Sequence, residues 1–213
     1  MPGLQLGFRM IAAAVAWFAI VLQYYLSVTK PGAEFLAVTV RYFSYFTMLS
    51  NILVALAMTL PWLAPDTRLG AFFARPSVRT AIASYIIIVS VIYYAVLRKL
   101  WNPEGWQLVA DTIEHCVTPS LFIADWLAFV PRGRVAARSV PWWLIFPIAY
   151  AAWSLIHGAA TGYYPYPFLN AAELGYQRVL INMAVLMAAF ALLGLLLVAI
   201  DRMLGRIEAP GTP

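Results

Sequence analysis

Charged residues are scarce in this sequence, because Asp, Glu, Lys and Arg make up only 11% of its 213 residues. Soluble domains carry about 25% charged residues, so this chain lacks the charge that a soluble surface of its length needs. Cysteine is almost absent too, and the single Cys116 excludes a disulfide within the chain and leaves the redox compartment open. The net charge is +5, and the Lys and Arg residues lie in short loops between apolar runs, where they act as topology signals. We therefore expect no nucleic-acid partner.

Apolar runs are abundant instead, and six of them are long enough to cross a bilayer, which takes about 20 mostly apolar residues. Turn-forming sequences such as Lys30-Pro31-Gly32 separate the runs, and no connection is long enough for a second domain. We predict an all-α, polytopic integral membrane protein in which residues 1–213 form a single six-transmembrane-helix bundle. The predicted spans cover about residues 7–28, 41–62, 79–97, 107–130, 141–162 and 177–204.

The distribution of positive charge predicts the orientation of this bundle. Nine Lys and Arg residues fall on the side that holds both termini, against five on the other side. Cytoplasmic loops carry the excess of Lys and Arg, so we predict that both termini are cytoplasmic. The first apolar run, Met10 to Val28, is longer than the ~7–15-residue core of a signal peptide, so we expect it to remain as a span in contact with membrane lipids.

Four polar residues are predicted to lie at similar depth in the membrane. At about 1.5 Å per residue, Thr47 lies about 9 Å and His115 about 12 Å into their spans, counted from the same face. His157 precedes the end of the fifth span by about five residues, and Asn182 follows the start of the sixth by about five, again near that face. Because polar groups inside a membrane are costly, we interpret this convergence as a candidate functional site.

Helical periodicity groups further polar residues around this depth. Asp111 lies one turn before His115, so its carboxylate could fix the tautomer of the imidazole. Pro119 has no N–H, and the carbonyl of His115 therefore loses its usual donor four residues later. We expect a kink there and a replacement partner for the carbonyl, such as a hydroxyl or water. Residues spaced by three or four positions share faces: Asp111, His115, Thr118 and Phe122 in the fourth span, and Ser44, Thr47 and Asn51 in the second.

Asp125 is excluded from this cluster by its depth. It lies about 15 Å farther along the fourth span than the histidine, which places it near the opposite interface. There we expect a topology or ion-pair role, with Arg132 or Arg134 within reach.

Each residue of the cluster also has a structural interpretation. Membrane threonines such as Thr47 usually hydrogen-bond their own helix or a neighbour. His115 and Asp111 could be a buried polar pair that holds helices together, and His157 could be an interfacial residue. Asp111, His115 and His157 are also the residues that a metal would use. Two histidines and carboxylates on separate helices are a weak metal signal, so we predict neither a metal nor a cofactor.

Four segments carry a family resemblance that covers nearly the whole chain. They are Arg41-Tyr-Phe-Ser-Tyr-Phe-Thr-Met-Leu-Ser-Asn51, Glu114-His-Cys-Val-Thr-Pro119, Asp125-Trp126 and Tyr164-Pro-Tyr-Pro-Phe-Leu169. With these segments the chain resembles the bacterial "Pr-six-Pr" membrane proteins, a group that is similar to the eukaryotic androgen-induced (androgen-dependent TFPI-regulating) membrane proteins. The resemblance implies an integral protein of the bacterial inner membrane.

The eukaryotic relatives are multi-pass hydrolases of fatty acid esters of hydroxy fatty acids, with a threonine nucleophile and a histidine. The resemblance carries these roles to Thr47 and His115. The chain departs from the eukaryotic pattern at Ser50 and Asn51, where that pattern has an acidic residue three positions after the threonine. The histidine also precedes Pro119 by one residue fewer than in the eukaryotic pattern.

Residues and resemblance together lead to the hypothesis of an intramembrane lipid-ester hydrolase. In it His115 takes the proton of Thr47, Asp111 or Glu114 orients the imidazole, and Asn51 or a backbone donor near the proline kink stabilises the oxyanion. The alternative is a non-catalytic membrane protein that binds or transports lipid or fatty acid. A third interpretation is a structural membrane protein whose polar core serves helix packing.

Overall fold

The computed structural model describes residues 3–100 and 102–208, and every regular element within them is a helix. The predicted all-α class is therefore confirmed. The elements are α1 (Gly3–Val28), α2 (Phe35–Phe43), α3 (Phe46–Leu63), α4 (Arg68–Ala74), α5 (Pro76–Ala95), η1 (Leu97–Lys99), α6 (Gly105–Thr112), η2 (Ile113–Val117), α7 (Thr118–Phe129), η3 (Ala137–Ser139), α8 (Val140–Trp143), α9 (Ile145–Thr161), η4 (Pro167–Leu169) and α10 (Ala171–Glu208).

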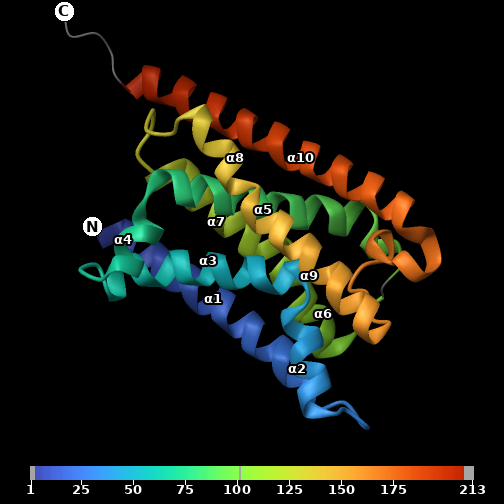
Figure 1. Cartoon of the computed structure of the whole chain (residues 1–213). Helices are drawn as coiled ribbons and strands as arrows, with labels where there is room; N and C mark the ends of the chain where they lie inside the picture. Colours follow the sequence, from blue (N-terminus) through green and yellow to red (C-terminus); the bar gives the residue numbers. More distant parts are fainter. Residues whose placement is uncertain (1–2, 101, 209–213) are drawn as a thin grey trace, which may run out of the picture.

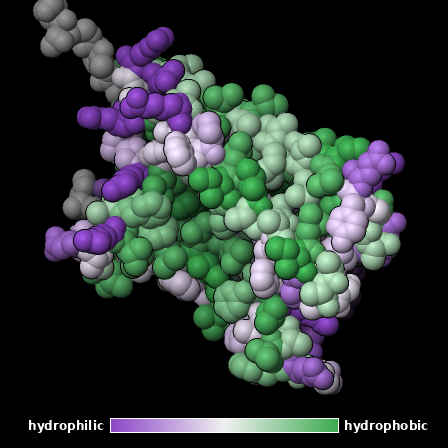
Figure 2. Space-filling view, viewed as in Figure 1, coloured by the Kyte–Doolittle hydropathy of each residue, from purple (hydrophilic) through white to green (hydrophobic). Residues whose placement is uncertain are grey.

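Five helical segments among the described residues are long and apolar enough to cross a membrane. Helices suit this setting because they satisfy every backbone polar group within the segment. The surface agrees with this reading, since hydrophilic side chains gather at the two ends of the molecule and a wide apolar band lies between them (Figure 2). These features are compatible with an integral membrane location. The five segments are Gly3–Val28, Phe46–Leu63, Pro76–Lys99, Ala137–Thr161 and Ala171–Ile207.

A further helical segment, residues 105–129, lies where we predicted the fourth span. It is not one regular helix, because a π turn over Ile113–Val117 separates α6 from α7. The segment packs against α1 and α5, and it runs between the same two ends of the molecule as those helices (Figure 1). Both ends of the described chain lie at the end of the molecule opposite α2 and α6 (Figure 1).

The predicted second span, residues 41–62, is wrong as a single helix. The chain breaks at Ser44 and Tyr45, and Tyr45 has an extended backbone with φ −88° and ψ 128°. Side chains from α9 hold this break, because Tyr150 donates to the Ser44 carbonyl (3.0 Å) and Trp153 donates to the Ser44 hydroxyl (3.1 Å). Ser44 therefore ends α2 and does not share a helix face with Thr47, which lies in the first turn of α3.

Asp125 lies in a buried charge cluster with Arg9 of α1 and Arg79 of α5. All three side chains are almost completely buried, with Asp125 0% exposed. The Arg9 Nε donates to Asp125 Oδ1 at 2.6 Å, and Arg79 donates to the other carboxylate oxygen. Arg79 also donates to the Ala57 carbonyl (2.6 Å), so the cluster joins α1, α3, α5 and α7.

The ion-pair role expected for Asp125 is thus observed, but the expected partners are wrong. Arg132 folds back over the Trp126 ring (4.5 Å to its centroid) and donates to the Trp126 carbonyl at 2.7 Å. Arg134 is exposed. We expected these two arginines because they are close to Asp125 in the sequence. The arginines that contact Asp125 come from helices far away in the chain.

Candidate functional site

A cavity of about 490 Å³ is lined in part by α2 and α6, which lie at the end of the molecule opposite the two ends of the described chain (Figure 1). Its walls come from α1, α2, α3, α5, η1, α6, the π turn and the loop before α10. Four of the predicted site residues line it, namely Thr47, Asp111, Glu114 and His115. Lys30 and Arg41 are the cationic residues of its lining. The structure therefore brings the threonine and the histidine, 68 positions apart in the sequence, to one cavity.

Thr47 occupies the second position of α3, directly after the break at Tyr45. The first N–H groups of a helix have no partner within it. The Thr47 N–H donates to the hydroxyl of Tyr166 at 3.1 Å, and the same hydroxyl lies 3.1 Å from Thr47 Oγ1. Burial raises the pKa of Tyr166 to about 12, so its phenol keeps its proton at neutral pH. Thr47 thus presents its hydroxyl at a helix N-terminus beside a neutral phenol.

His115 is held in place from two sides. Its Nδ1 lies 2.9 Å from the Asp111 carbonyl and 3.4 Å from the Asp111 Oδ1. The Tyr93 ring stacks on the imidazole with 3.9 Å between ring centroids, and the Tyr93 hydroxyl donates to the other carboxylate oxygen of Asp111. An Nδ1–H donor to Asp111 assigns the lone pair to Nε2, which is the tautomer that a general base needs.

The His115 carbonyl has a replacement hydrogen-bond partner, as the missing N–H of Pro119 predicts. The chain forms a π turn just before Pro119, in which the Thr118 N–H donates to the Ile113 carbonyl. The Ser90 hydroxyl of α5 donates to the His115 carbonyl at 2.7 Å. A hydroxyl from a neighbouring helix therefore replaces the lost backbone donor and ties the histidine to α5.

We expect Ser90→Ala to lower the free energy of unfolding by about 1–3 kcal/mol, because it leaves the His115 carbonyl without a donor. Ser84→Ala is the matched control on the same helix. The Ser84 hydroxyl bonds only its own helix at the Ala81 carbonyl, and its loss should cost much less. Thermal unfolding of both variants in detergent measures the difference, and equal midpoints would contradict this assignment.

Asn51 has a different role from the one predicted. Its side-chain amide nitrogen donates to the Thr47 carbonyl (2.9 Å) and to the Glu114 carbonyl (3.2 Å). Both amide hydrogens are engaged, and the residue is 1% exposed, so Asn51 has no donor to offer an oxyanion. Its bonds instead fix α3 to the π turn, which sets the position of Thr47 relative to His115.

Asp111 and Glu114, the two candidates for orienting the imidazole, differ in their contacts with His115. Asp111 is the one that contacts the imidazole, whereas Glu114 makes no hydrogen bond to His115 in the described chain. The Glu114 side chain is buried, and its Oε1 has no partner among the described residues. Of the two alternatives left open by the sequence, the structure favours Asp111 as the orienting group.

His157 and Asn182 do not line the cavity, although they were predicted at the same depth. Both contact the loop between α9 and α10. His157 Nδ1 lies 3.3 Å from the Tyr163 carbonyl, and the Asn182 amide donates to the Phe168 carbonyl at 2.9 Å. That loop contributes Tyr163 and Tyr166 to the cavity wall. The two residues therefore support the site by holding one of its walls.

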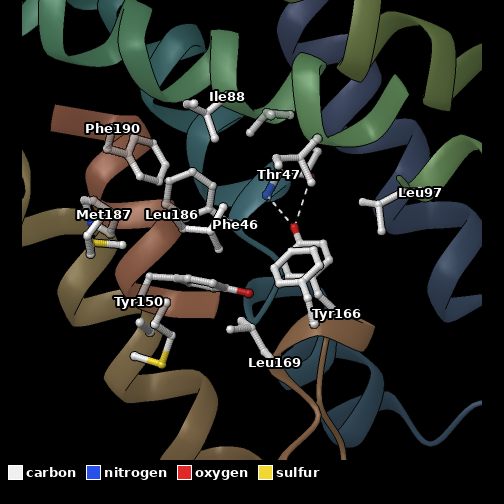
Figure 3. Close-up of a pocket in the computed structure, with 16 residues that line it drawn as sticks. Phe46, Thr47, Ile88, Leu97, Tyr150, Tyr166, Leu169, Leu186, Met187 and Phe190 are labelled. Carbon is white, nitrogen blue, oxygen red and sulfur yellow. Dashed lines mark hydrogen bonds between the residues drawn. The ribbon is translucent and has the colours of Figure 1, made fainter. Parts of the chain in front are cut away.

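A second, apolar pocket of about 60 Å³ adjoins the polar cavity at Thr47 (Figure 3). Thr47, Leu97 and Tyr166 line both. The hydrogen bonds between Tyr166 and Thr47 lie at this boundary, as the dashed lines in Figure 3 show. The threonine hydroxyl therefore lies where a polar compartment meets an apolar one.

Sequence reasoning missed Tyr93, Tyr166 and Ser90. Tyr166 belongs to one of the segments that carry the family resemblance, and nothing in the sequence marks its hydroxyl as a partner of Thr47. Ser90 and Tyr93 are three positions apart on α5 and face the π turn together, a spacing that could have marked them as a pair. Within residues 3–100 and 102–208, no group of three or more His, Cys, Asp or Glu residues could hold a metal ion.

Comparison of the chain with protein-family models, curated proteins and solved structures gives no match. The assignment of a function therefore depends on the chemistry of the cavity.

Proposed function

We propose that the protein is an intramembrane hydrolase of lipid esters, with Thr47 as nucleophile and His115 as base, and that it belongs to the Pr-six-Pr group. One observation carries the proposal. The hydroxyl of Thr47 lies at the junction of a polar cavity and an apolar pocket, and an imidazole oriented by Asp111 faces the same cavity. A lipid ester has this composition, with a polar group at the reacting carbon and a hydrocarbon chain beside it.

The reaction has two steps. His115 Nε2 accepts the proton of Thr47 Oγ1 as this oxygen attacks the ester carbonyl carbon, and the tetrahedral oxyanion forms. The oxyanion collapses, the carbon–oxygen bond to the alcohol breaks, and the imidazolium returns the proton to the departing alcohol. Water, deprotonated by His115, then attacks the acyl-threonine, and the proton passes back to Thr47 as the fatty acid leaves.

In this mechanism, the oxyanion is stabilised at the start of α3. The N–H of Thr47 has no intrahelical acceptor, and the helix dipole places partial positive charge there. The substrate oxygen would take over this N–H from the Tyr166 hydroxyl, which now accepts it at 3.1 Å. Tyr166, protonated at neutral pH, would then be a second donor for the oxyanion.

The membrane setting of the proposal is a six-span bundle in the bacterial inner membrane. The segment of residues 105–129 would be the sixth span beside the five apolar ones, and its three carboxylates within the helices, Asp111, Glu114 and Asp125, are all buried in the protein interior. An even number of spans agrees with chain ends at one end of the molecule (Figure 1). The excess of Lys and Arg there favours a cytoplasmic location for both termini.

Labelling with a fluorophosphonate probe, followed by peptide mapping, tests the proposal. We expect an adduct on Thr47 that disappears in Thr47→Ala and forms more slowly in His115→Ala. Thr59→Ala is the matched control, because Thr59 lies on the same helix but donates to the Ala55 carbonyl away from the cavity. Complete absence of labelling of the folded protein would refute the nucleophile.

The alternative of a non-catalytic lipid-binding protein is favoured by one observation. The Thr47 hydroxyl is bonded to Tyr166, and no hydrogen bond joins it to His115. Catalytic hydrogen bonds are often absent before substrate binds, which is why the hydrolase stays the first proposal. Saturable binding of a fatty acid without any acyl transfer would decide for the alternative.

A further inference from the structure

Apart from Thr47, the walls of the apolar pocket offer a ligand no free hydrogen-bonding group. It lies between α3, α5, α9 and α10, and apart from Thr47 its polar side chains are Tyr150 and Tyr166. The Tyr150 hydroxyl donates to the Ser44 carbonyl (3.0 Å), and the Tyr166 hydroxyl is engaged by Thr47. A ligand in this pocket would find apolar contacts everywhere except at the threonine, so its occupant must be hydrocarbon.

Aromatic side chains close the end of the pocket that lies away from Tyr166 (Figure 3). Phe190 of α10 packs on Phe46 with 5.6 Å between ring centroids and on Tyr85 with 6.1 Å. Phe46 in turn packs on Tyr150 at 5.0 Å. Met187 lies one turn before Phe190 and lines the pocket as well. The pocket therefore has one polar end, at Thr47, and one end blocked by rings.

The size of the pocket limits its occupant. One water-sized group needs about 10–15 Å³ of cavity volume on this measure, so a volume of about 60 Å³ holds between about four and six such groups. Methylene and methyl groups are of comparable size. The space therefore matches a short to medium hydrocarbon chain.

We infer that this pocket binds the hydrocarbon chain of the acyl half of the ester, and that Phe190 and Met187 set the chain length that is accepted. The inference rests on the proposed function for the position of the ester carbon at Thr47. The alcohol half then extends into the larger polar cavity, where Lys30 and Arg41 lie. Chain-length selection follows from the blocked end, because a chain that reaches Phe190 has no further space.

The test is hydrolysis of a p-nitrophenyl ester series, from acetyl to palmitoyl, by the purified full chain in detergent. We expect the highest kcat/KM at about four to six carbons, with a loss of about 10-fold or more for each methylene beyond the end of the pocket. Phe190→Ala should move the optimum to longer chains. Met187→Ala should do so with less disturbance of the fold, because Met187 is only half-buried.

Two further variants complete the test. Ala151→Leu adds bulk to the pocket wall and should lower hydrolysis of the hexanoyl ester far more than that of the acetyl ester. Met203→Ala removes an exposed methionine from the same helix as Met187 and should leave the length profile unchanged. Hydrolysis with an unchanged length profile in all three pocket variants (Phe190→Ala, Met187→Ala and Ala151→Leu) would overturn the pocket assignment and leave the proposed function intact.

If the wild type hydrolyses no ester, the proposed function fails, and a binding measurement still decides on the pocket. Photolysis with hexanoic acid that carries a diazirine on its terminal carbon should label the peptide that contains Met183, Met187 and Phe190. Ala151→Leu should abolish this labelling. Labelling elsewhere, or equal labelling of the Ala151→Leu variant, would show that hydrocarbon does not occupy the pocket.

Discussion

Replacement of His115 by alanine is expected to lower kcat for ester hydrolysis by about 10²–10⁴-fold, the contribution that a positioned general base usually makes. The imidazole is fixed in the cavity by Asp111 and by the stacked Tyr93 ring. Thr47→Ala should abolish the same activity because it removes the nucleophile. The double variant should be no worse than Thr47→Ala alone, since the two residues act as a unit.

Two controls separate this loss from damage to the fold. Cys116→Ala changes an exposed neighbour of His115 and should retain the wild-type rate. Thr47→Ser keeps a hydroxyl at the start of α3 and should retain measurable turnover. Stopped-flow or continuous assays with a hexanoyl p-nitrophenyl ester provide the rates. A His115→Ala variant that is as fast as the wild type would exclude the histidine as the base.

The sequence predicted the parts of this site that depend on helix geometry. Depth counting brought Thr47 and His115 to the same face, and both line one cavity in the structure. The missing N–H of Pro119 predicted a replaced partner for the His115 carbonyl, and the Ser90 hydroxyl is that partner. The proline deduction holds because the missing N–H is a local property of the chain. The depth count placed Thr47 near this face although the helix that it assumed breaks at Ser44 and Tyr45.

The sequence did not predict what depends on tertiary contacts. The break before Thr47 is held by Tyr150 and Trp153, from a helix about 100 residues away in the sequence. No local sequence pattern predicts this break. The second amide hydrogen of Asn51 is engaged only because the π turn brings the Glu114 carbonyl close. Depth also could not distinguish His157, which holds a loop, from a residue that faces the cavity.

Asp125→Ala is expected to lower the free energy of unfolding by about 3–5 kcal/mol, the cost of breaking a buried ion pair by removing one partner. The variant keeps the positive charges of Arg9 and Arg79 in the protein interior and removes the negative charge between them. Asp125 is 0% exposed, and Arg79 is 1% exposed, so water cannot take over the role of the carboxylate. Thermal unfolding in detergent measures the loss.

Asp66→Ala is the matched control, because Asp66 is an exposed carboxylate in the loop before α4 and its removal should change stability little. A triple variant distinguishes charge from packing. Arg9→Met, Arg79→Met and Asp125→Leu together replace the cluster by apolar side chains of similar size and should recover much of the stability. If Asp125→Ala unfolds at the wild-type temperature, the buried cluster does not hold α1, α5 and α7 together. If the triple variant is as unstable as Asp125→Ala, shape rather than charge explains the loss.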